Sequence, residues 1–241
     1  MAAPFDLKKF SDDAQRAARA LVNWFYGLYC GGDRRPVFYD IPTTCAPLME
    51  LTKNVKVIQE EFEAIIPRRL AIPRYHEIDD TEHAISGGEK DWRVFMLYLL
   101  DQDLAINRRL CPRTCALIDA VPVKLQVFFS ILDGGKSVPA HCGPYRGFLR
   151  YHLGLRVPKS NPPSFRVKDQ RYTWKEGEAI LFDDTWEHQV YNESDEIRAV
   201  LIVDIKRPMP FVPDMLNRLC IAFAKLTYAK MVLKNLARYT R

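Results

Sequence analysis

Residues 123–132 read VKLQVFFSIL, and they open a region of short β-rich runs that extends to about residue 208. β-Branched and aromatic residues dominate these runs, as is typical of strands in a half-buried sheet. The predicted strands are residues 123–132, 149–157, 165–167, 171–174, 179–182, 189–191 and 199–205. Turn residues separate them, including Gly134, Gly135, Gly143, Pro144, Pro162, Pro163 and Gly177. Many short strands without alternating helices predict an antiparallel barrel or jelly roll, and they disfavour a Rossmann-type sheet.

Helical patterns precede this region. Apolar residues recur at helical spacing over residues 14–28, after a Ser11 that we expect to cap the helix, and again over residues 48–65 up to Pro67. A strand is predicted at residues 92–100 and a short helix at residues 112–120. Residues 36–41 are expected to form a short extended segment.

Residues 75–90 form a polar segment that we expect to be a flexible, solvated loop facing the substrate. A second metal cluster is the alternative there, but its acids lack a fixed scaffold. The potential ligands are His76, Glu77, Asp79, Asp80, Glu82 and His83.

The C-terminal residues 214–241 predict a basic amphipathic helix. Leucines provide an apolar surface, and Arg218, Lys225, Lys230 and Lys234 supply charge. Such a helix can lie on anionic lipid, or it can pack on the barrel with its basic face in solvent. Both readings stay open at this point.

The length of 241 residues favours one domain. We divide it into a helical support with a loop (1–121), a jelly-roll core (122–210) and a basic amphipathic helix (211–241). A hydrophobic content of 48% with 27% charged residues excludes disordered and fibrous classes. A net charge of +5 is too mild to indicate nucleic acid, and we expect no nucleic-acid partner.

The six cysteines show no disulfide framework and no zinc-ribbon spacing, so we expect reduced thiols. The first residues do not form a signal peptide, and no apolar run approaches the length of a membrane span. These features predict a soluble, cytoplasmic protein that can still contact a membrane surface.

His141 and His188 lie where predicted strands end beside turns. Strand ends at the mouth of a barrel are where a small ligand cavity opens. Non-haem iron oxygenases hold the metal with two histidines and one carboxylate, but Gly143 occupies the usual carboxylate position. Either water fills that place or Asp184 does, and we prefer Asp184 as a residue that orients a bound water. Either histidine alone could equally be a hydrogen-bonded core or loop residue.

Arg198 opens the predicted strand 199–205. A guanidinium inside a barrel needs an anion, which can be the carboxylate of an organic acid or one of the protein's own acids. Arg150 and His152 alternate along residues 149–155 and therefore face the same side of their strand. We expect them to form a second anion-binding edge of the same cavity.

Several motifs occur together in this order. Residues 141–155 read HCGPYRGFLRYHLGL, residues 174–177 read WKEG, and residues 182–188 read FDDTWEH, followed by Arg198 and Asp204. Residues 123 to about 210 thus resemble the aspartyl/asparaginyl β-hydroxylase family. The resemblance implies a mainly β, double-stranded β-helix (jelly-roll, cupin-like) fold with flanking N- and C-terminal helices. It also implies Fe(II), 2-oxoglutarate and O2.

By position in these motifs, the resemblance implies that His141 and His188 bind iron. Arg198 with Ser130 would hold the distal carboxylate of 2-oxoglutarate, and Arg150 with His152 its metal-proximal end. Animal peptide hydroxylases of the family also carry glycine at the position of Gly143, so a site with two histidines is compatible with activity.

The substrate is either a membrane lipid or an Asp or Asn side chain of a peptide. Residues 149–155, the Arg207-Pro208-Met209 run and the basic tail look more like the lipid branch of the family. Gly143 and residues 182–188 look more like the peptide branch. A different class also stays open, because jelly rolls serve as non-catalytic metal-binding modules, in which Arg198 would be a buried ion-pair member.

Overall fold

The computed structural model describes residues 7–239, with side chains from residue 14 onward. Within this range the strands form two antiparallel sheets. The larger sheet contains, in order, β1 (Phe38–Tyr39), β9 (Ala179–Phe182), β6 (Phe148–Arg156), β11 (Arg198–Lys206), β4 (Lys124–Leu132), β2 (Trp92–Leu99) and β3 (Gln102–Asp103). The smaller sheet contains β5 (Val138–His141), β10 (His188–Tyr191), β7 (Ser164–Val167) and β8 (Gln170–Thr173).

From β4 to β11 the chain passes back and forth between the two sheets. β4, β6, β9 and β11 belong to the larger sheet, whereas β5, β7, β8 and β10 belong to the smaller one. Eight antiparallel strands shared in this way form a jelly roll. The predicted double-stranded β-helix is therefore confirmed, and β1, β2 and β3 extend its larger sheet.

Alternation along the strands builds a core on each side of the larger sheet. Phe128 and Phe182 point inward, where they meet Phe165 of the smaller sheet. Leu149 and Tyr151 point outward and pack against helices. The predicted alternation of β6 is thus correct, because Arg150 and His152 lie on the inner side, where they line a cavity.

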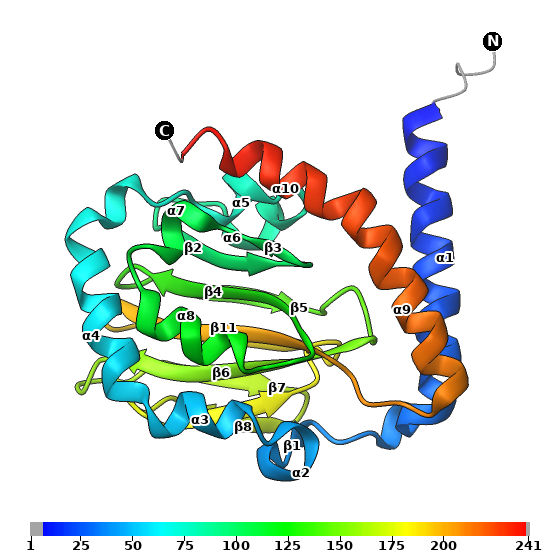
Figure 1. Ribbon diagram of the computed structural model, residues 1–241, viewed down its shortest axis with the longest axis horizontal. Coiled ribbons are helices and arrows are strands. Elements are labelled where there is room, and N and C mark those ends of the chain that lie inside the picture. The colour runs from blue at the N-terminus through cyan, green and yellow to red at the C-terminus, as the bar shows by residue number, and fades with distance from the viewer. Residues whose placement is uncertain (1–6, 240–241) are drawn as a thin grey trace.

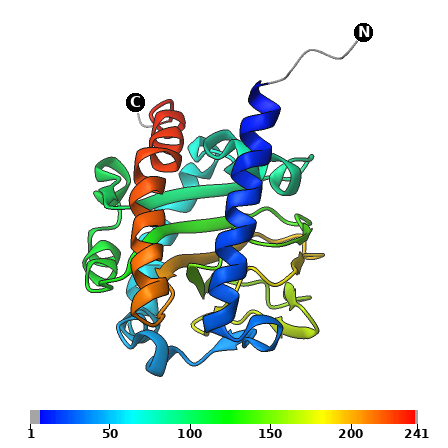
Figure 2. The same ribbon diagram turned by 90° about the vertical axis from the view of Figure 1, so that its right-hand side faces the viewer.

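The helices cover the outer core and one end of the sheets (Figure 1). They are α1 (Leu7–Cys30), α2 (Ile41–Cys45), α3 (Leu48–Lys53), α4 (Val55–Ile65), α5 (Tyr75–Ile78), α6 (His83–Ser86), α7 (Ala105–Arg108), α8 (Pro112–Asp119), α9 (Phe211–Leu226) and α10 (Tyr228–Leu236). Short 3-10 turns lie at η1 (Gly32–Arg34), η2 (Ile66–Ala71) and η3 (Asp80–Glu82). Helices α3, α4 and α8 pack on the outer face of the larger sheet. Helices α1 and α9 stand at one end of the strands (Figure 2).

Two predicted helices differ from the observed ones. Helix α1 begins at Leu7, so Ser11 lies inside the helix and is not its cap. The helix predicted over residues 48–65 is broken at Asn54, whose φ of −102° and ψ of 22° separate α3 from α4. Helix α1 ends at Cys30, and Gly31 follows it with a positive φ of 98°.

The segment of residues 75–90 was predicted to be a loop, and this prediction is wrong because the segment is largely folded and partly buried. It contains α5, η3 and α6. The Asp79 carboxylate is buried, and it accepts hydrogen bonds from Thr81 and from the Tyr228 hydroxyl of α10. No group of three or more metal-ligating side chains occurs here or elsewhere in the described residues, so the alternative of a second metal cluster is not supported.

The predicted tail helix is two helices, which meet at Thr227. Helix α10 packs on the body of the protein through Ala229, Val232 and Leu236, which are all buried. Helix α9 instead leaves a row of large apolar side chains exposed. No helix in the described part of the chain is both long and apolar enough to span a bilayer.

Candidate active site

The two histidines of the predicted iron site lie side by side on the smaller sheet. β5 and β10 pair antiparallel, and His188 stands opposite His141 in the register. Their ring centroids are 4.1 Å apart. In each ring Nδ1 faces a backbone carbonyl, at 2.8 Å from Pro139 and at 2.9 Å from Trp186. A carbonyl only accepts, so each Nδ1 carries the proton and each Nε2 keeps a free lone pair.

The surroundings keep both imidazoles neutral. Burial, followed by the neighbouring His141, lowers the pKa of His188 to about 3. Burial also lowers the pKa of His141. A neutral imidazole can donate its lone pair to a metal ion, whereas a protonated one cannot. Two neighbouring imidazole rings, each with an unprotonated Nε2 atom, therefore fit a metal ion.

Arg198 lies at the start of β11 with 2% of its surface exposed. No carboxylate of the described side chains pairs with it, and its Nε atom is buried without a hydrogen-bond partner. Its guanidinium carbon lies 4.1 Å from the ring centroid of Trp174. Burial lowers the pKa of Arg198 to about 9, so it remains charged at neutral pH. Within the described residues, Arg198 is therefore not the buried ion-pair member that the non-catalytic alternative requires.

Arg150 and His152 project from β6 into the same region but differ in their partners. The Arg150 Nε and Nη2 atoms donate to the two carboxylate oxygens of Asp204 at 2.7 and 2.8 Å. Both ring nitrogens of His152 are buried and lack a hydrogen-bond partner. Burial, followed by the charges of Arg198 and Arg150, lowers the His152 pKa well below its ordinary value. Arg150 is thus a cation whose position is fixed by Asp204, and His152 is a neutral ring whose two nitrogen atoms have no hydrogen-bond partner.

One cavity collects the predicted site residues from both sheets. Ser130 on β4 accepts a 2.9 Å hydrogen bond from the indole of Trp92 on β2. The polar and charged lining residues are Ser130, His141, Arg150, His152, His188 and Arg198. Apolar walls come from residues that include Phe165, Phe182 and Ile202. Phe165 is buried and also faces the site.

The amino-acid sequence of the chain matches a known protein family. The profile described as "Aspartyl/Asparaginyl beta-hydroxylase" matches residues 52–208. The chain belongs to the aspartyl/asparaginyl β-hydroxylase family. The match begins well before residue 123, so the family resemblance extends into α3 and α4, further than the motifs alone indicated.

Relatives within this family include proteins with different named substrates. The chain is 37% identical over 161 residues to an "Ornithine lipid ester-linked acyl 2-hydroxylase" of Rhizobium tropici, which covers 66% of this chain and 57% of that protein. It is 31% identical over 166 residues to the human "Aspartyl/asparaginyl beta-hydroxylase", covering 66% of this chain and 21% of that protein. The chain thus spans little more than half of the first relative and about a fifth of the second.

Solved structures that match parts of the chain have low sequence identity to it. A predicted oxalate decarboxylase of Thermotoga maritima is 16% identical with a TM-score of 0.35, over 51% of this chain and 86% of that one. An RmlC-like cupin with a double-stranded β-helix from Methanocaldococcus jannaschii is 20% identical with a TM-score of 0.28, over 39% of this chain and 76% of that one.

Gly143, at the position where non-haem iron oxygenases commonly have a carboxylate, makes a close contact with Asp184. The Gly143 N–H donates to the Asp184 carbonyl at 2.8 Å, and a β-carbon at Gly143 would overlap the Asp184 carboxyl group. Burial raises the pKa of Asp184 to about 7, although Arg150 opposes the rise. Asp184 lies 3.5 Å from Arg150 and does not form a group of three metal ligands with the histidines in the described structure. Its role beside a metal-bound water stays a prediction.

Two supporting residues were missed by the sequence reasoning. Trp92 was treated only as the start of a strand, yet its indole fixes Ser130. Asp204 was recognised as part of a family motif without a role, yet it holds Arg150 with two hydrogen bonds. A pairing of β6 with β11 would have indicated this contact, because Asp204 stands opposite Arg150 in that register.

Proposed function

We propose that the protein is an Fe(II)- and 2-oxoglutarate-dependent dioxygenase that hydroxylates an unactivated C–H bond of a membrane lipid. The observation that carries the proposal is Arg198, a buried guanidinium without an acidic partner among the described residues, in one cavity with two neutral imidazoles. A buried cation of this kind requires an anion from a ligand. The dicarboxylate 2-oxoglutarate would supply this anion.

Each site residue has a role that its geometry supports. His141 and His188 would hold iron through Nε2, because their Nδ1 protons are taken by backbone carbonyls. Arg198 and Ser130 would bind the distal carboxylate of 2-oxoglutarate, for which the planar guanidinium is suited. Iron, when bound, supplies oxygen activation coupled to decarboxylation of 2-oxoglutarate.

The metal-proximal end of 2-oxoglutarate would face the second edge of the cavity. His152 offers ring nitrogens that have no other partner, and Arg150 offers a charge whose direction Asp204 fixes. The aromatic walls exclude water, which strengthens these electrostatic contacts. Asp184 would orient a water molecule beside the metal.

The substrate class is argued from the relatives and from charge. The Rhizobium tropici relative is named for a lipid acyl group and aligns over more of its own length than the human relative. The C-terminal helices also carry a surplus of basic residues, which suits an anionic lipid surface. We propose that the protein is cytoplasmic and in peripheral contact with a membrane. An Asp or Asn side chain of a peptide is the second candidate, supported by the human relative and by Gly143.

Succinate formation tests the proposal. The protein is supplied with Fe(II), 2-oxoglutarate and O2, together with either ornithine lipid or an Asp- and Asn-containing peptide. We expect substrate-dependent succinate with the lipid and none after His188→Ala. Succinate with the peptide alone would move the assignment to the second candidate. Metal binding without succinate on either substrate would identify a non-catalytic metal-binding module instead.

Arg198→Ala is expected to act mainly on co-substrate binding. Loss of a buried, charge-assisted contact costs roughly 2–5 kcal/mol, so the 2-oxoglutarate affinity should fall by at least an order of magnitude. Binding is measured by titration of 2-oxoglutarate into the metal-loaded protein. Arg156→Ala is the matched control, since Arg156 lies on the neighbouring strand and makes only a half-exposed ion pair with Glu63. An unchanged affinity in Arg198→Ala would contradict the assigned role.

A further inference from the structure

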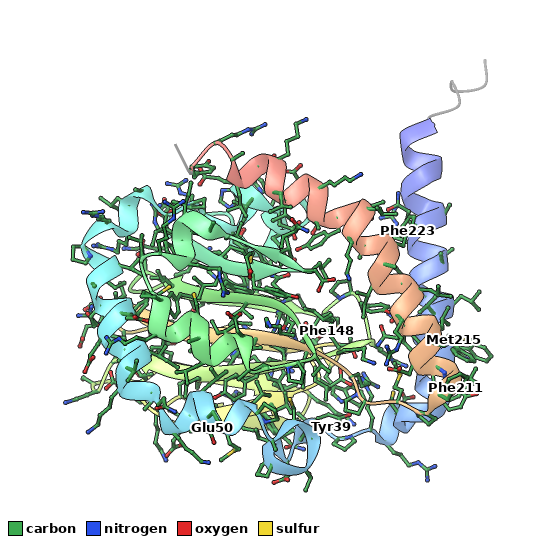
Figure 3. The ribbon with its side chains drawn as sticks, in the orientation of Figure 1. Tyr39, Glu50, Phe148, Phe211, Met215 and Phe223 are labelled. Atoms are coloured by element: carbon green, nitrogen blue, oxygen red, sulfur yellow. The ribbon has the colours of Figure 1, made fainter. Side chains whose placement is uncertain are left out.

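Helices α1 and α9 expose large apolar side chains that nothing in the described structure covers. Trp24 is 61% exposed and Phe223 is 67% exposed. On α9 the outward row has one-turn spacing, and Figure 3 labels three of its members along that helix. The exposed residues on the two helices are Leu21, Trp24, Leu28, Tyr29, Phe211, Val212, Met215, Leu219, Phe223 and Leu226. We call this set the α1–α9 face.

The two helices form one continuous surface. They run side by side across the end of the strands (Figure 2). The Tyr26 hydroxyl of α1 contacts the Cys220 sulfur of α9 at 3.9 Å, and it lies 3.1 Å from the Tyr145 hydroxyl. Tyr145 in turn donates to Asn217 of α9 at 2.7 Å. The inner sides of both helices are therefore fixed to the protein, and their apolar outer sides face away from it.

The helices of the α1–α9 face and the adjoining α10 carry a surplus of basic residues. Residues 14–30 and 211–239 contain seven Lys and Arg against one acid, Asp214, which already pairs with Lys206 and Arg218. The whole chain contains 35 basic and 30 acidic residues, so the remaining sequence contains 28 basic and 29 acidic residues. The net positive charge of the chain is thus concentrated in these two segments. The exposed basic residues are Arg16, Arg19, Arg218, Lys230, Lys234 and Arg238.

We propose that the α1–α9 face docks on an anionic lipid bilayer, with its apolar side chains inserted at the interface and its basic residues against lipid phosphates. Amphipathic helices with this division of apolar and basic surface lie in the plane of the interface. Neither helix is suited to span the bilayer. A second copy of the chain on this face would bring its own basic residues against these, which opposes association.

The docked helices also hold the segment that leads away from His141. Asn23 of α1 donates to the Pro144 carbonyl at 2.9 Å and accepts from the Arg146 N–H at 2.9 Å. Asn217 of α9 donates to the Gly147 carbonyl at 2.7 Å. Residues 144–147 follow the proposed iron ligand His141 closely in the chain. Docking would therefore bring these residues to the membrane, where a lipid substrate is found. This last step rests on the proposed function, whereas the docking itself does not.

The surface differs from the one that the sequence predicted. The sequence left open whether the basic tail lies on lipid or packs on the barrel, and α10 does use its apolar side for packing while Lys225 pairs with Asp101. Most of the large exposed apolar side chains come from α9 and from α1 at the opposite end of the chain. Deletion of residues 214–241 would expose buried core, so point variants are required to test the surface.

Co-sedimentation with vesicles tests the docking surface. The full chain is mixed with vesicles of phosphatidylcholine, with or without phosphatidylglycerol. We expect binding to the anionic vesicles that falls steeply with added salt. The double variant Trp24→Gln/Phe223→Gln should bind at least tenfold more weakly. Its matched control is Leu70→Gln/Leu110→Gln, which changes two exposed leucines away from this face and should bind like the wild type.

Three results would overturn the proposal: no binding of the wild type to anionic vesicles, equal binding by the Trp24/Phe223 variant, or a dimer in sedimentation velocity that this variant dissolves. The last would assign the face to a second copy. Thermal unfolding shows whether each variant is folded, and Lys230→Glu/Lys234→Glu provides a second test through charge. Succinate formation without vesicles is measured in parallel, so that a failure of the proposed chemistry is distinguished from a failure of docking.

Discussion

At Gly143 the backbone lies directly against the carboxyl group of Asp184. The absence of a side chain is what allows Asp184 to sit beside Arg150, close to the two histidines. A residue with a carboxylate at position 143 would compete with Asp184 for the same space. The glycine is therefore part of how this site accommodates its acid, and not only a turn residue.

Gly143→Ala is expected to lower the free energy of unfolding by about 1–3 kcal/mol, because the new β-carbon forces a shift of the packed carboxyl group. The cost should be much smaller when Asp184→Ala is already present. Chemical denaturation of the two single variants and the double variant measures this coupling. Equal costs of Gly143→Ala in both backgrounds would show that Asp184 is not the obstacle.

For individual residues, the sequence pattern predicted which side of a strand a side chain faces better than it predicted which residue that side chain contacts. Alternation placed Arg150 and His152 on one side of their strand, and the structure agrees. The clamp between Arg150 and Asp204 was not predicted, because it depends on which residues β6 and β11 bring opposite each other. Register between distant strands is set by packing across the whole sheet and is not visible in either strand alone.

Helix α8 shows how one element can cap another. It begins at Pro112, and the Glu61 carboxylate of α4 accepts hydrogen bonds from the N–H groups of Arg113 and Thr114 at 3.0 and 2.7 Å. These N–H groups have no partner within their own helix. Burial alone would raise the pKa of Glu61, but the hydrogen bonds from Thr114 and Arg113 outweigh it and lower the pKa.

Glu61→Gln should lower the free energy of unfolding by about 1–3 kcal/mol at neutral pH, since a buried charge-assisted cap is lost. The folded-state pKa is depressed, so this stabilisation is present above the ordinary pKa of 4.5 and is lost as the pH falls through the folded-state value. Urea denaturation at pH 7 and at low pH measures it. Glu60→Gln is the control, because Glu60 is exposed and contacts only Arg113. An equal loss at both pH values would argue against the cap.

Strand boundaries were predicted more closely than helix and loop boundaries. β9 matches its prediction, and β6 begins and ends within one residue of it. The segment of residues 75–90 was taken for a loop because its polar residues lack periodicity. Its order depends on Asp79 and on Tyr228, which lies 149 residues further along the chain. Tertiary capping of this kind has no local signal.

The two C-terminal helices, α9 and α10, differ in how closely they pack against the rest of the protein. Leu236 on α10 is 3% exposed, whereas Leu226 on α9 is 64% exposed. We expect Leu236→Ala to cost about 2–5 kcal/mol of stability, because it opens a cavity in packed surroundings. Leu226→Ala should change stability by less than about 0.5 kcal/mol. Thermal or chemical unfolding compares them, and a similar cost in both would mean that α10 is not anchored as described.

The proposed ligands are divided between the two sheets of the jelly roll. His141 and His188 belong to the smaller sheet, whereas Ser130, His152 and Arg198 belong to the larger one. A metal ion alone would link β5 and β10 of the smaller sheet. If 2-oxoglutarate were bound as well, its contacts with Ser130, His152 and Arg198 would also link the smaller sheet to the larger one. Metal and co-substrate together should then raise the melting temperature more than the sum of their separate effects.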